Sequence, residues 1–408
     1  MAVAKMAVLR RLREMLLLGV MLASPLFLFA QTGTPPDPPA PSNTPPSAEP
    51  WRKGITVNGF ASLSYTYNTN DPIPQSNQFR VFDFNDDEPQ LDVAQLVIQR
   101  SISKPNQFDF LFDLTAGSGT PPVTAAYGLF RNSRTGIGEH VDIPQMYLSY
   151  IAPLGQGLRF DFGKFVTHMG YESIPGYDGY NNNFSQSFLF GYGIPFTHTG
   201  LRMTYPFSNR ISAIFTVNNG WDDIQKVNGG YTVGGQLSVA TSQTTHLVFN
   251  FVHGPEHPHD NSDQTNDWEI IATWTPGFYL SFALDGLYGH QDNGVAPGQA
   301  AIWRDLAGYA RFYFTHRLSL AFRGEVFRDG GGVRTGTNQT LREYTLTPSY
   351  DLPAEFSKIN PRFKGADGTF VIRADLRRDF SDHATFRKGG NSWTDQQSTA
   401  AVNLIYQF

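Results

Sequence analysis

The stretch that decides the fold is STAAVNLIYQF, residues 398–408. Small or apolar side chains stand at every second position from Ser398 to Phe408, and mostly polar ones, such as Asn403 and Gln407, stand between them. Such a strand has one apolar and one polar face, which suits a barrel wall between lipid and an aqueous lumen. Half-buried strands of soluble sheets alternate in the same way, so the rest of the sequence must decide between the two.

The amino terminus is typical of a secretory signal peptide. Four basic residues within the first thirteen positions precede an apolar run over residues 15–29, which ends at Ala30. The alternative is a membrane anchor, but this run is interrupted by Pro25 and is shorter than the roughly 20 residues of a spanning helix. We therefore expect residues 1–30 to be a signal peptide and any membrane residence of the exported chain to depend on strands.

The next segment, residues 31–53, contains PPDPPAPSNTPPSAEP and has too few apolar residues to pack into a core. This composition predicts an extended periplasmic linker. The alternative is a disordered remnant behind the signal peptide. The sequence thus divides into a signal peptide (1–30), a Pro-rich linker (31–53) and a folded domain (54–408).

The composition limits the possible functions. The chain has no cysteine, which excludes disulfides, thiolate metal sites and thiol catalysis. Its formal charge of −5 becomes −8 once the signal segment, with four basic residues and one acidic residue, is removed. Nothing is basic enough for nucleic-acid binding. Aromatic residues make up 14% of the chain, an abundance that the aromatic girdles of a membrane barrel would explain.

From residue 54 onward, about sixteen alternating segments are joined in turn by short turns and by long loops. This rhythm predicts an all-β, transmembrane, antiparallel up-and-down barrel of about sixteen strands, with short periplasmic turns and long extracellular loops. A soluble sandwich would not need the persistent rhythm. One connection, Asp351 to Gly368, is too long for a periplasmic turn, so either it is an insertion or the strand count is wrong by a hairpin.

Charged side chains on the polar faces of these strands are candidate pore-lining residues. A charge on the lipid face near the midplane costs about 2 to 4 kcal/mol, so such side chains should point into the lumen. The candidates are Arg159, Asp161, Arg202, Asp285, Arg311, Arg323, Glu325, Arg373, Asp375 and Arg377.

Five short motifs follow one another in a consistent order: GKF (163–165), GYE (170–172), PFTHTG (195–200), NGWD (219–222) and GPE (254–256). Together they resemble the OmpL-like putative β-barrel porin family over residues 54–408. The resemblance implies a bacterial outer-membrane porin, a water-filled pore for passive diffusion of small hydrophilic solutes or ions. It implies neither catalytic residues nor a cofactor. The insertion at Asp351 to Gly368 departs from the pattern.

The resemblance to outer-membrane barrels also implies partners. The closing strand, with Tyr406 and the terminal Phe408, resembles the signal that the barrel-assembly machinery reads in such proteins. Outer-membrane lipid and small hydrophilic solutes are the other expected partners, and a homotrimer is a further possibility because sixteen-stranded porins are commonly trimers.

The longest loop, His168 to Thr197, is the candidate constriction, because in general porins the loop after the fifth strand folds into the lumen. Its candidate residues are Glu172, Tyr177, Asp178 and Tyr180. The two acids would oppose the lumen arginines and create a transverse field that sorts solutes by charge. The alternatives are a surface loop over the mouth and an aromatic slide for sugars.

Other functions are less favoured. His253, His257 and His259, close to Glu256 and Asp260, could bind zinc or copper, but no regular structure would fix them on one face, so a solvated loop is preferred. No nucleophile elbow, zinc-protease helix or P-loop occurs, which argues against an enzyme. A plugged receptor or adhesin barrel and, less favoured, a barrel hydrolase remain as alternatives, although sixteen strands favour an open channel.

Overall fold

The structure is a computed structural model that describes residues 54–101, 104–132, 134–135, 137–359 and 367–408. The predicted signal peptide and Pro-rich linker lie outside these residues. No helix among the described residues is long and apolar enough to cross a membrane.

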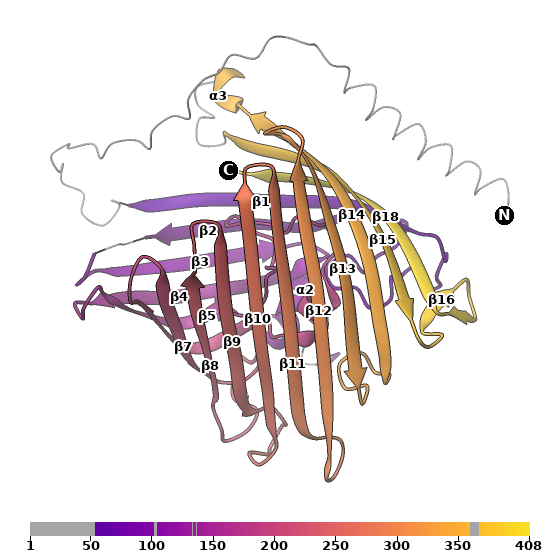
Figure 1. The fold of residues 1–408 in the computed structure, drawn as a ribbon, viewed down its shortest axis with the longest axis horizontal. Helices are drawn as coiled ribbons and strands as arrows, with labels where there is room; N and C mark the ends of the chain where they lie inside the picture. Colours follow the sequence, from indigo (N-terminus) through magenta and orange to yellow (C-terminus); the bar gives the residue numbers. More distant parts are fainter. Residues whose placement is uncertain (1–53, 102–103, 133, 136, 360–366) are drawn as a thin grey trace. The chain divides into compact units, whose positions relative to one another are not determined.

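Sixteen antiparallel strands form one closed barrel in which each strand pairs with its neighbours in the sequence and the last wall strand returns to the first (Figure 1). The predicted fold class is confirmed. The wall strands are β1 (Ile55–Asn68), β2 (Pro89–Arg100), β3 (Phe108–Ala116), β4 (Val141–Ala152), β5 (Leu158–Val166), β6 (Thr197–Pro206), β7 (Ile211–Asn218), β8 (Thr232–Ala240), β9 (Thr245–Pro255), β10 (Gln264–Gly277), β11 (Leu280–Ala296), β12 (Gln299–Tyr313), β13 (Leu318–Gly330), β14 (Gln339–Ala354), β15 (Gly368–Ser381) and β18 (Gln396–Gln407).

The closure of the barrel depends on the stretch that opened the sequence analysis. Strand β18 lies between β15 and β1, and Leu404 pairs with Leu63 of β1. The backbone N–H and C=O of Phe408 both bond to Gly59 at 3.0 Å. A Cβ at Gly59 would lie 2.2 Å from the Phe408 ring, so a larger residue there would force the ring to move. The terminal aromatic residue is therefore part of the seam.

The two faces of each strand separate as the alternation predicts. In β13, Leu318, Phe322 and Val326 are exposed on the outer face, while Arg323 and Glu325 are buried on the inner face. Side chains of a barrel strand point alternately outward and inward, so the apolar set meets hydrocarbon and the polar set faces the interior. Polar burial in this molecule therefore means burial inside the barrel.

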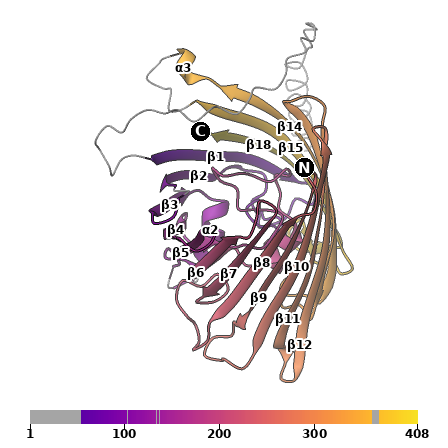
Figure 2. The same cartoon turned by 60° about the vertical axis from the view of Figure 1, so that its left-hand side comes forward.

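The wall is uneven in height. Strand β3 has 9 residues and β7 has 8, whereas β11 has 17 and β12 has 15. Figure 2 shows the long strands β10 to β12 beside the shorter β6 to β8. Strands β11 and β12 are paired as far as Ala296 and Gln299. The last residues of β11, HQDNGVA (290–296), are mostly polar, so the apolar alternation stops before the strand ends.

The long connection between β14 and β15 is an insertion. It contains the short helix α3 (Phe356–Ile359), and the sixteen strands close without a further hairpin in the described part of this region. The alternative of a miscounted hairpin is therefore wrong. Three other loops contain regular structure: α2 (Thr120–Thr124) with η1 (Ala125–Tyr127) before β4, the π-helical turn η2 (Leu189–Gly193) before β6, and the hairpin β16 (Phe386–Lys388) with β17 (Ser392–Thr394) before β18.

Candidate functional site

The thirty residues between β5 and β6, residues 167–196, lie inside the barrel and are called here the inward loop. Its backbone N–H groups donate to carboxylates on the inner face of distant strands. Gly170 donates to Glu269 at 2.9 Å, and Leu189 donates to Glu325 at 2.6 Å. Similar bonds join Tyr171 to Asp285 at 3.1 Å and Phe184 to Asp375 at 2.9 Å. The inward position expected as one of the alternatives is thus the one observed.

Arginines of β13 and β15 bind the acceptor groups of the loop, which are its backbone carbonyls and the Glu172 carboxylate. Arg323 pairs with Glu172 at 2.7 Å and also donates to the Ser185 carbonyl at 2.7 Å. Arg373 donates to the Asn181 carbonyl at 2.5 Å, and Arg377 donates to the Gln186 carbonyl. Hydrogen bonds to charged groups are among the stronger ones in proteins, so these contacts fix the loop against β13 and β15.

An apolar cluster fills the space between the inward loop and the long strands β12 and β13. Phe188, Phe190 and Ile194 of the loop are buried together with Trp303 of β12 and Phe327 of β13. The Trp303 indole donates to the Gly193 carbonyl at 3.1 Å. This part of the lumen is packed like a protein core.

A second loop, residues 69–88 between β1 and β2, joins the same cluster through Val81 and Phe82. It is anchored by Arg80, which pairs with Asp83 at 2.7 Å and with Asp379 of β15 at 2.9 Å. The sequence analysis did not predict this inward loop. Apolar residues in an otherwise polar extracellular segment were the available signal, because they need a buried site.

Because of this packing, most of the predicted pore-lining residues are buried. Seven of them are at most 3% exposed and do not face water as we expected. Asp161 is covered by its partners Arg159 and Arg202, and the inward loop covers the other six: Asp285, Arg323, Glu325, Arg373, Asp375 and Arg377. Glu172 also differs from the expectation, because it pairs directly with Arg323 and does not oppose arginines across a gap. Arg311 is half-buried and donates to Asn182 of the loop at 2.7 Å.

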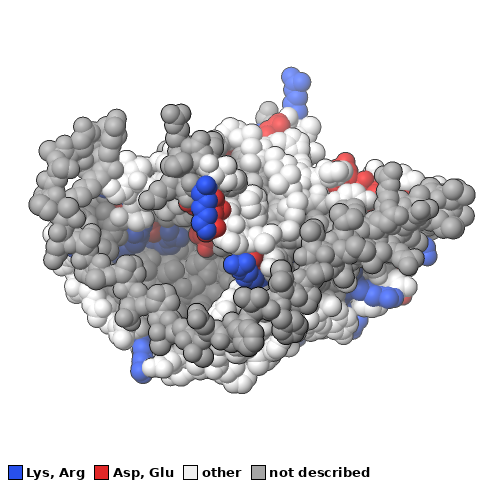
Figure 3. Space-filling model, turned by 90° about the horizontal axis from the view of Figure 1, so that it is seen from above, with Lys and Arg blue, Asp and Glu red and all other residues white. Residues whose placement is uncertain are grey.

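The other side of the lumen keeps two accessible arginines, on β5 and β6, in an ion-pair network with buried acids of β3 and β5. Arg159 bridges Asp109 at 3.1 Å and Asp161 at 2.7 Å, and Arg202 bonds the second oxygen of Asp161 at 2.8 Å. The two arginine side chains are 28% and 16% exposed. In the space-filling view of Figure 3 the surface is hollowed, and basic and acidic side chains lie next to each other in the hollow.

A cavity of about 180 Å³ lies between the inward loop and strands β2 to β4. Asp113 and Asp178 line it, and neither forms an ion pair with a basic side chain in the described part of the chain. Gln95 donates to Asp113 at 2.9 Å and accepts from the Tyr177 N–H at 2.7 Å. Burial raises the pKa of Asp178, as expected for a carboxylate without a cation beside it.

The two predicted tyrosines of the loop pack against the wall. Tyr177 and Tyr180 contact a small cluster that includes Phe60 and Ile405, and Arg373 lies 5.3 Å from the Tyr180 ring. They hold the loop tip near the β1 and β18 seam. A continuous aromatic slide is not what these contacts form.

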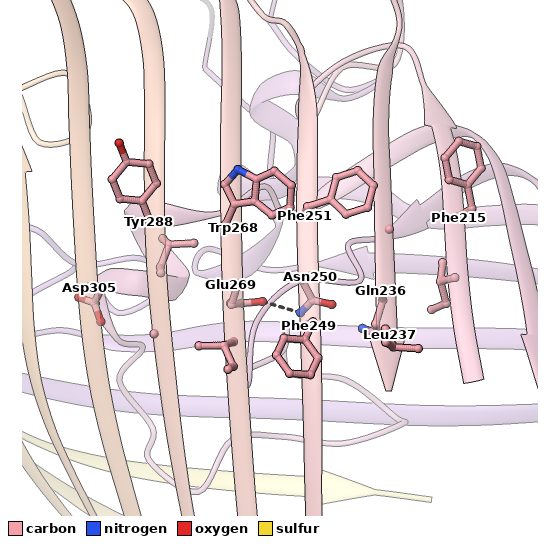
Figure 4. A pocket seen from close by; sticks show the side chains of 15 residues that line it. Phe215, Gln236, Leu237, Phe249, Asn250, Phe251, Trp268, Glu269, Tyr288 and Asp305 are labelled. Atoms are coloured by element: carbon pink, nitrogen blue, oxygen red, sulfur yellow. Dashed lines mark hydrogen bonds between the residues drawn. The ribbon is translucent and has the colours of Figure 1, made fainter. Parts of the chain in front are cut away.

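The larger hollow of the barrel, about 670 Å³, is on the lipid side of β7 to β12. Figure 4 shows its aromatic side chains on successive strands, among them the stacked rings of Phe251 and Trp268, 5.5 Å apart. Phe215, Phe249 and Trp268 are exposed, as outward residues of a membrane wall are. This hollow belongs to the lipid contact and not to a pore.

The histidine segment does not assemble a metal site in the part of the chain that the structure describes. His253 contacts Asn266 at 2.5 Å, and His257 contacts Gln291 at 2.7 Å. Glu256 accepts from the Trp221 N–H at 2.7 Å, and burial raises its pKa to about 7. The side chains of His253, His257 and Glu256 therefore each have a separate structural contact.

Asp109 and Asp113 are also buried on β3, but the sequence analysis did not select them as site residues. It also missed Gln95 and Arg80. The alternation shows which side chains point inward. It carries no information on which of them a loop from elsewhere in the sequence will cover.

Several solved structures share this architecture. The outer-membrane channel DcaP of Acinetobacter baumannii aligns with a TM-score of 0.53 and 8% identity, over 87% of this chain and 97% of that one. The anion-selective porin from Comamonas acidovorans gives 0.51 and 11%, over 87% and 99%. OmpF of Salmonella typhi, in a complex with daunomycin, gives 0.51 and 12%, over 87% and 97%. At these identities the likeness shows the fold alone.

No curated protein matches the sequence significantly. A family model does match, and it covers the whole barrel, residues 54–408. Its description is "Putative beta-barrel porin-2, OmpL-like", which agrees with the resemblance of the five motifs and with the closed sixteen-stranded wall. The protein is thus an outer-membrane barrel of the porin type, and the chain belongs to the OmpL-like β-barrel porin-2 family.

Proposed function

We propose that the protein is a passive diffusion pore whose solutes pass along one side of the lumen, between the inward loop and the shorter strands β3, β5 and β6. The observation that carries this proposal is the asymmetry of the interior. Inward charges of β10 to β15 are buried under the loop, whereas Arg159 and Arg202 of the shorter wall remain accessible. Small hydrophilic solutes are the substrate class that such a polar passage accepts.

The charges along this passage favour cations. Arg159 and Arg202 are matched by Asp109 and Asp161 in one ion-pair network. Asp113 and Asp178 line the cavity without a basic partner among the described residues, so they add negative charge to the passage when they are ionised. Side-chain charge rings of one sign select ions of the opposite sign.

The test is conductance of the refolded mature protein in planar bilayers, with the reversal potential measured under a potassium chloride gradient. We expect discrete ohmic steps and a reversal potential of the sign that marks cation preference. The double variant Asp113→Asn and Asp178→Asn should reduce that preference at least about twofold, while Glu88→Gln, an exposed loop acid, should not. Steps with unchanged selectivity in the double variant would move the selecting charges elsewhere.

One observation favours a second candidate, the plugged receptor or adhesin barrel. The apolar cluster of Phe188, Phe190, Trp303 and Phe327 inside the lumen resembles a plug. A correctly folded barrel that gives no conductance steps would support this reading over the pore. The family and the structural neighbours, among them an outer-membrane channel and an anion-selective porin, favour a channel over an enzyme.

A homotrimer is also part of the proposal. One structural neighbour, OmpT of Vibrio cholerae, is described in a trimer form, with a TM-score of 0.52 and 8% identity over 87% of this chain and 99% of that chain. Sedimentation in density-matched detergent would give the number of chains per particle. A single-chain particle would argue for a monomeric pore.

A further inference from the structure

Four arginines point outward from adjacent strands of the tall wall, and they are called here the outer arginine row. They are Arg304 of β12, Arg328 of β13, Arg342 of β14 and Arg378 of β15, and all four are exposed. An arginine on the lipid-facing side of a barrel is costly near the midplane and tolerated only near the membrane boundary. A whole row of them therefore needs a reason.

The strand register makes the row continuous. Arg304 and Arg328 are direct partners across β12 and β13. Arg342 pairs with Val326, two positions from Arg328 on the same face, and Arg378 pairs with Tyr344, two positions from Arg342. Directly opposed and diagonal neighbours on one face of a sheet are within reach of long side chains.

The row lies toward the ends of the strands that carry the long loops. Arg328 is two residues from the end of β13, and Arg342 is three residues from the start of β14. On the other side of the row the outer face becomes apolar, with Leu306, Val326 and Leu376 each about half exposed. The row thus marks the border between the hydrocarbon band and the extracellular rim.

Little on the protein neutralises these charges. No Asp or Glu is exposed on β12, β13, β14 or β15, and among the described residues the row forms one long ion pair, Arg328 to Asp382 at 3.7 Å. Arg378 donates to the Gln396 side chain at 2.6 Å, and Arg304 lies 5.4 Å from the Tyr288 ring. Like charges opposite each other destabilise a sheet, so an anion placed between them would be favourable.

Strands β6 to β11 lack such outward-pointing charges. On β6 to β11 no exposed position holds Arg, Lys, Asp or Glu. The charge is therefore concentrated on one sector of the outer surface, which is a property of a binding site and not of a general girdle.

We propose that the outer arginine row binds the phosphate groups of an anionic lipid in the extracellular leaflet. Guanidinium groups match phosphate oxygens with paired, charge-assisted hydrogen bonds. The exposed Leu306, Val326 and Leu376 would contact the acyl chains of the same molecule. The site needs a ligand that is anionic at its head and apolar at its tail, which is the chemistry of a phosphorylated lipid.

The experiment is native mass spectrometry of the folded mature barrel in zwitterionic detergent, titrated with lipid A that carries two phosphates. Arg328→Gln with Arg342→Gln should weaken binding about tenfold or more, the effect of losing charge-assisted bonds. The matched control, Arg210→Gln with Arg317→Gln, removes two exposed arginines at the short-turn end and should leave the affinity within about twofold. Lipid A freed of its phosphates should bind the unmodified barrel as weakly as the row variant binds the intact lipid.

Four results would overturn the proposal: unchanged affinity in the row variant, an equal loss in the control, equal binding of the phosphate-free lipid, or displacement of the lipid by inorganic phosphate. Inorganic phosphate alone is the last arm. If it displaces the lipid at equal concentration, the row is a site for free anions and not for a lipid. Heat-modified mobility on a gel confirms that each variant is folded, and Arg328→Lys with Arg342→Lys keeps the charge if the glutamine pair does not fold.

Discussion

The inner faces of the two halves of this barrel contain the same kinds of residue but are used differently. On β10 to β15, arginines and carboxylates are buried and bond to a loop that belongs to another part of the chain. On β3 to β6, arginines and carboxylates pair with one another, and the arginines stay partly accessible. The alternation of polar residues along a barrel strand therefore shows which side chains point inward, but it does not show which of them contact water.

The largest effect should come from breaking the buried side at Arg323. Arg323→Met leaves Glu172 without its partner and Glu343 with only the longer contact to Arg377 at 3.7 Å, and removing one member of a buried ion pair costs about 3 to 5 kcal/mol. Arg328→Met, outward on the same strand, is the control and should cost much less. Urea unfolding followed by tryptophan fluorescence measures both, and equal stability of the two variants would contradict the comparison.

The same Arg323 variant sharpens the functional difference between the halves. A loop released from β13 should enlarge the passage and raise single-channel conductance. A fall in conductance, with the barrel still folded, would mean that the loop narrows the pore less when held than when free.

A smaller effect is expected at Trp303. Trp303→Phe keeps an aromatic ring in the apolar cluster but leaves the Gly193 carbonyl without its donor, which costs about 1 to 3 kcal/mol. Trp268→Phe, on the lipid side, is the control because that indole is 56% exposed. The free energies of unfolding of the two variants should differ in this order, and the reverse order would place Trp303 outside the packing that holds the loop.

The smallest expected effect is a pH dependence of stability at the carboxyl-terminal end of the inward loop, where the loop joins β6. Asp222 accepts from the N–H groups of Phe196 at 2.6 Å and Thr197 at 2.7 Å, and burial raises its pKa from 3.8 to about 7. The folded protein therefore keeps a proton that the unfolded chain loses, so stability from this group is full below about pH 4 and declines as pH rises toward 7.

The test compares Asp222→Asn with the unmodified protein between pH 4 and 7. The asparagine oxygen can accept the same two bonds but does not titrate, so the unmodified protein should lose more stability over this range than the variant. Burial also raises the pKa of Glu256 to about 7 and that of Asp223 to about 6, and both residues are present in the two proteins. Parallel pH profiles would show that Asp222 does not titrate in this window.

Much of the fold could be predicted because a barrel wall is specified locally. Each strand reports its own faces through its alternation, and the seam follows from the closing strand with Phe408. The prediction of sixteen strands is confirmed even beside the insertion at Asp351 to Gly368. The end of β11, residues 290–296, could not be predicted because its side chains are mostly polar and the apolar alternation stops before it.

The candidate site could be predicted only in part, because its decisive contacts join distant segments. Alternation placed Arg323 and Asp113 correctly on inner faces, but it could not show that the first is covered by the inward loop while the second borders a cavity. That distinction depends on where residues 167–196 pack. The loop's length suggested an inward position without identifying its partners.

The anchors of the inward loop also order its assembly in time. Glu269, Asp285, Glu325 and Asp375 all follow the loop in the chain, between 99 and 191 positions away from the groups they bind. Contacts over such separations form late, since the intervening chain must first be closed into a loop. The nascent barrel is consequently at its widest before its carboxyl-terminal strands are in place, and it narrows itself as the last third of the chain joins the wall.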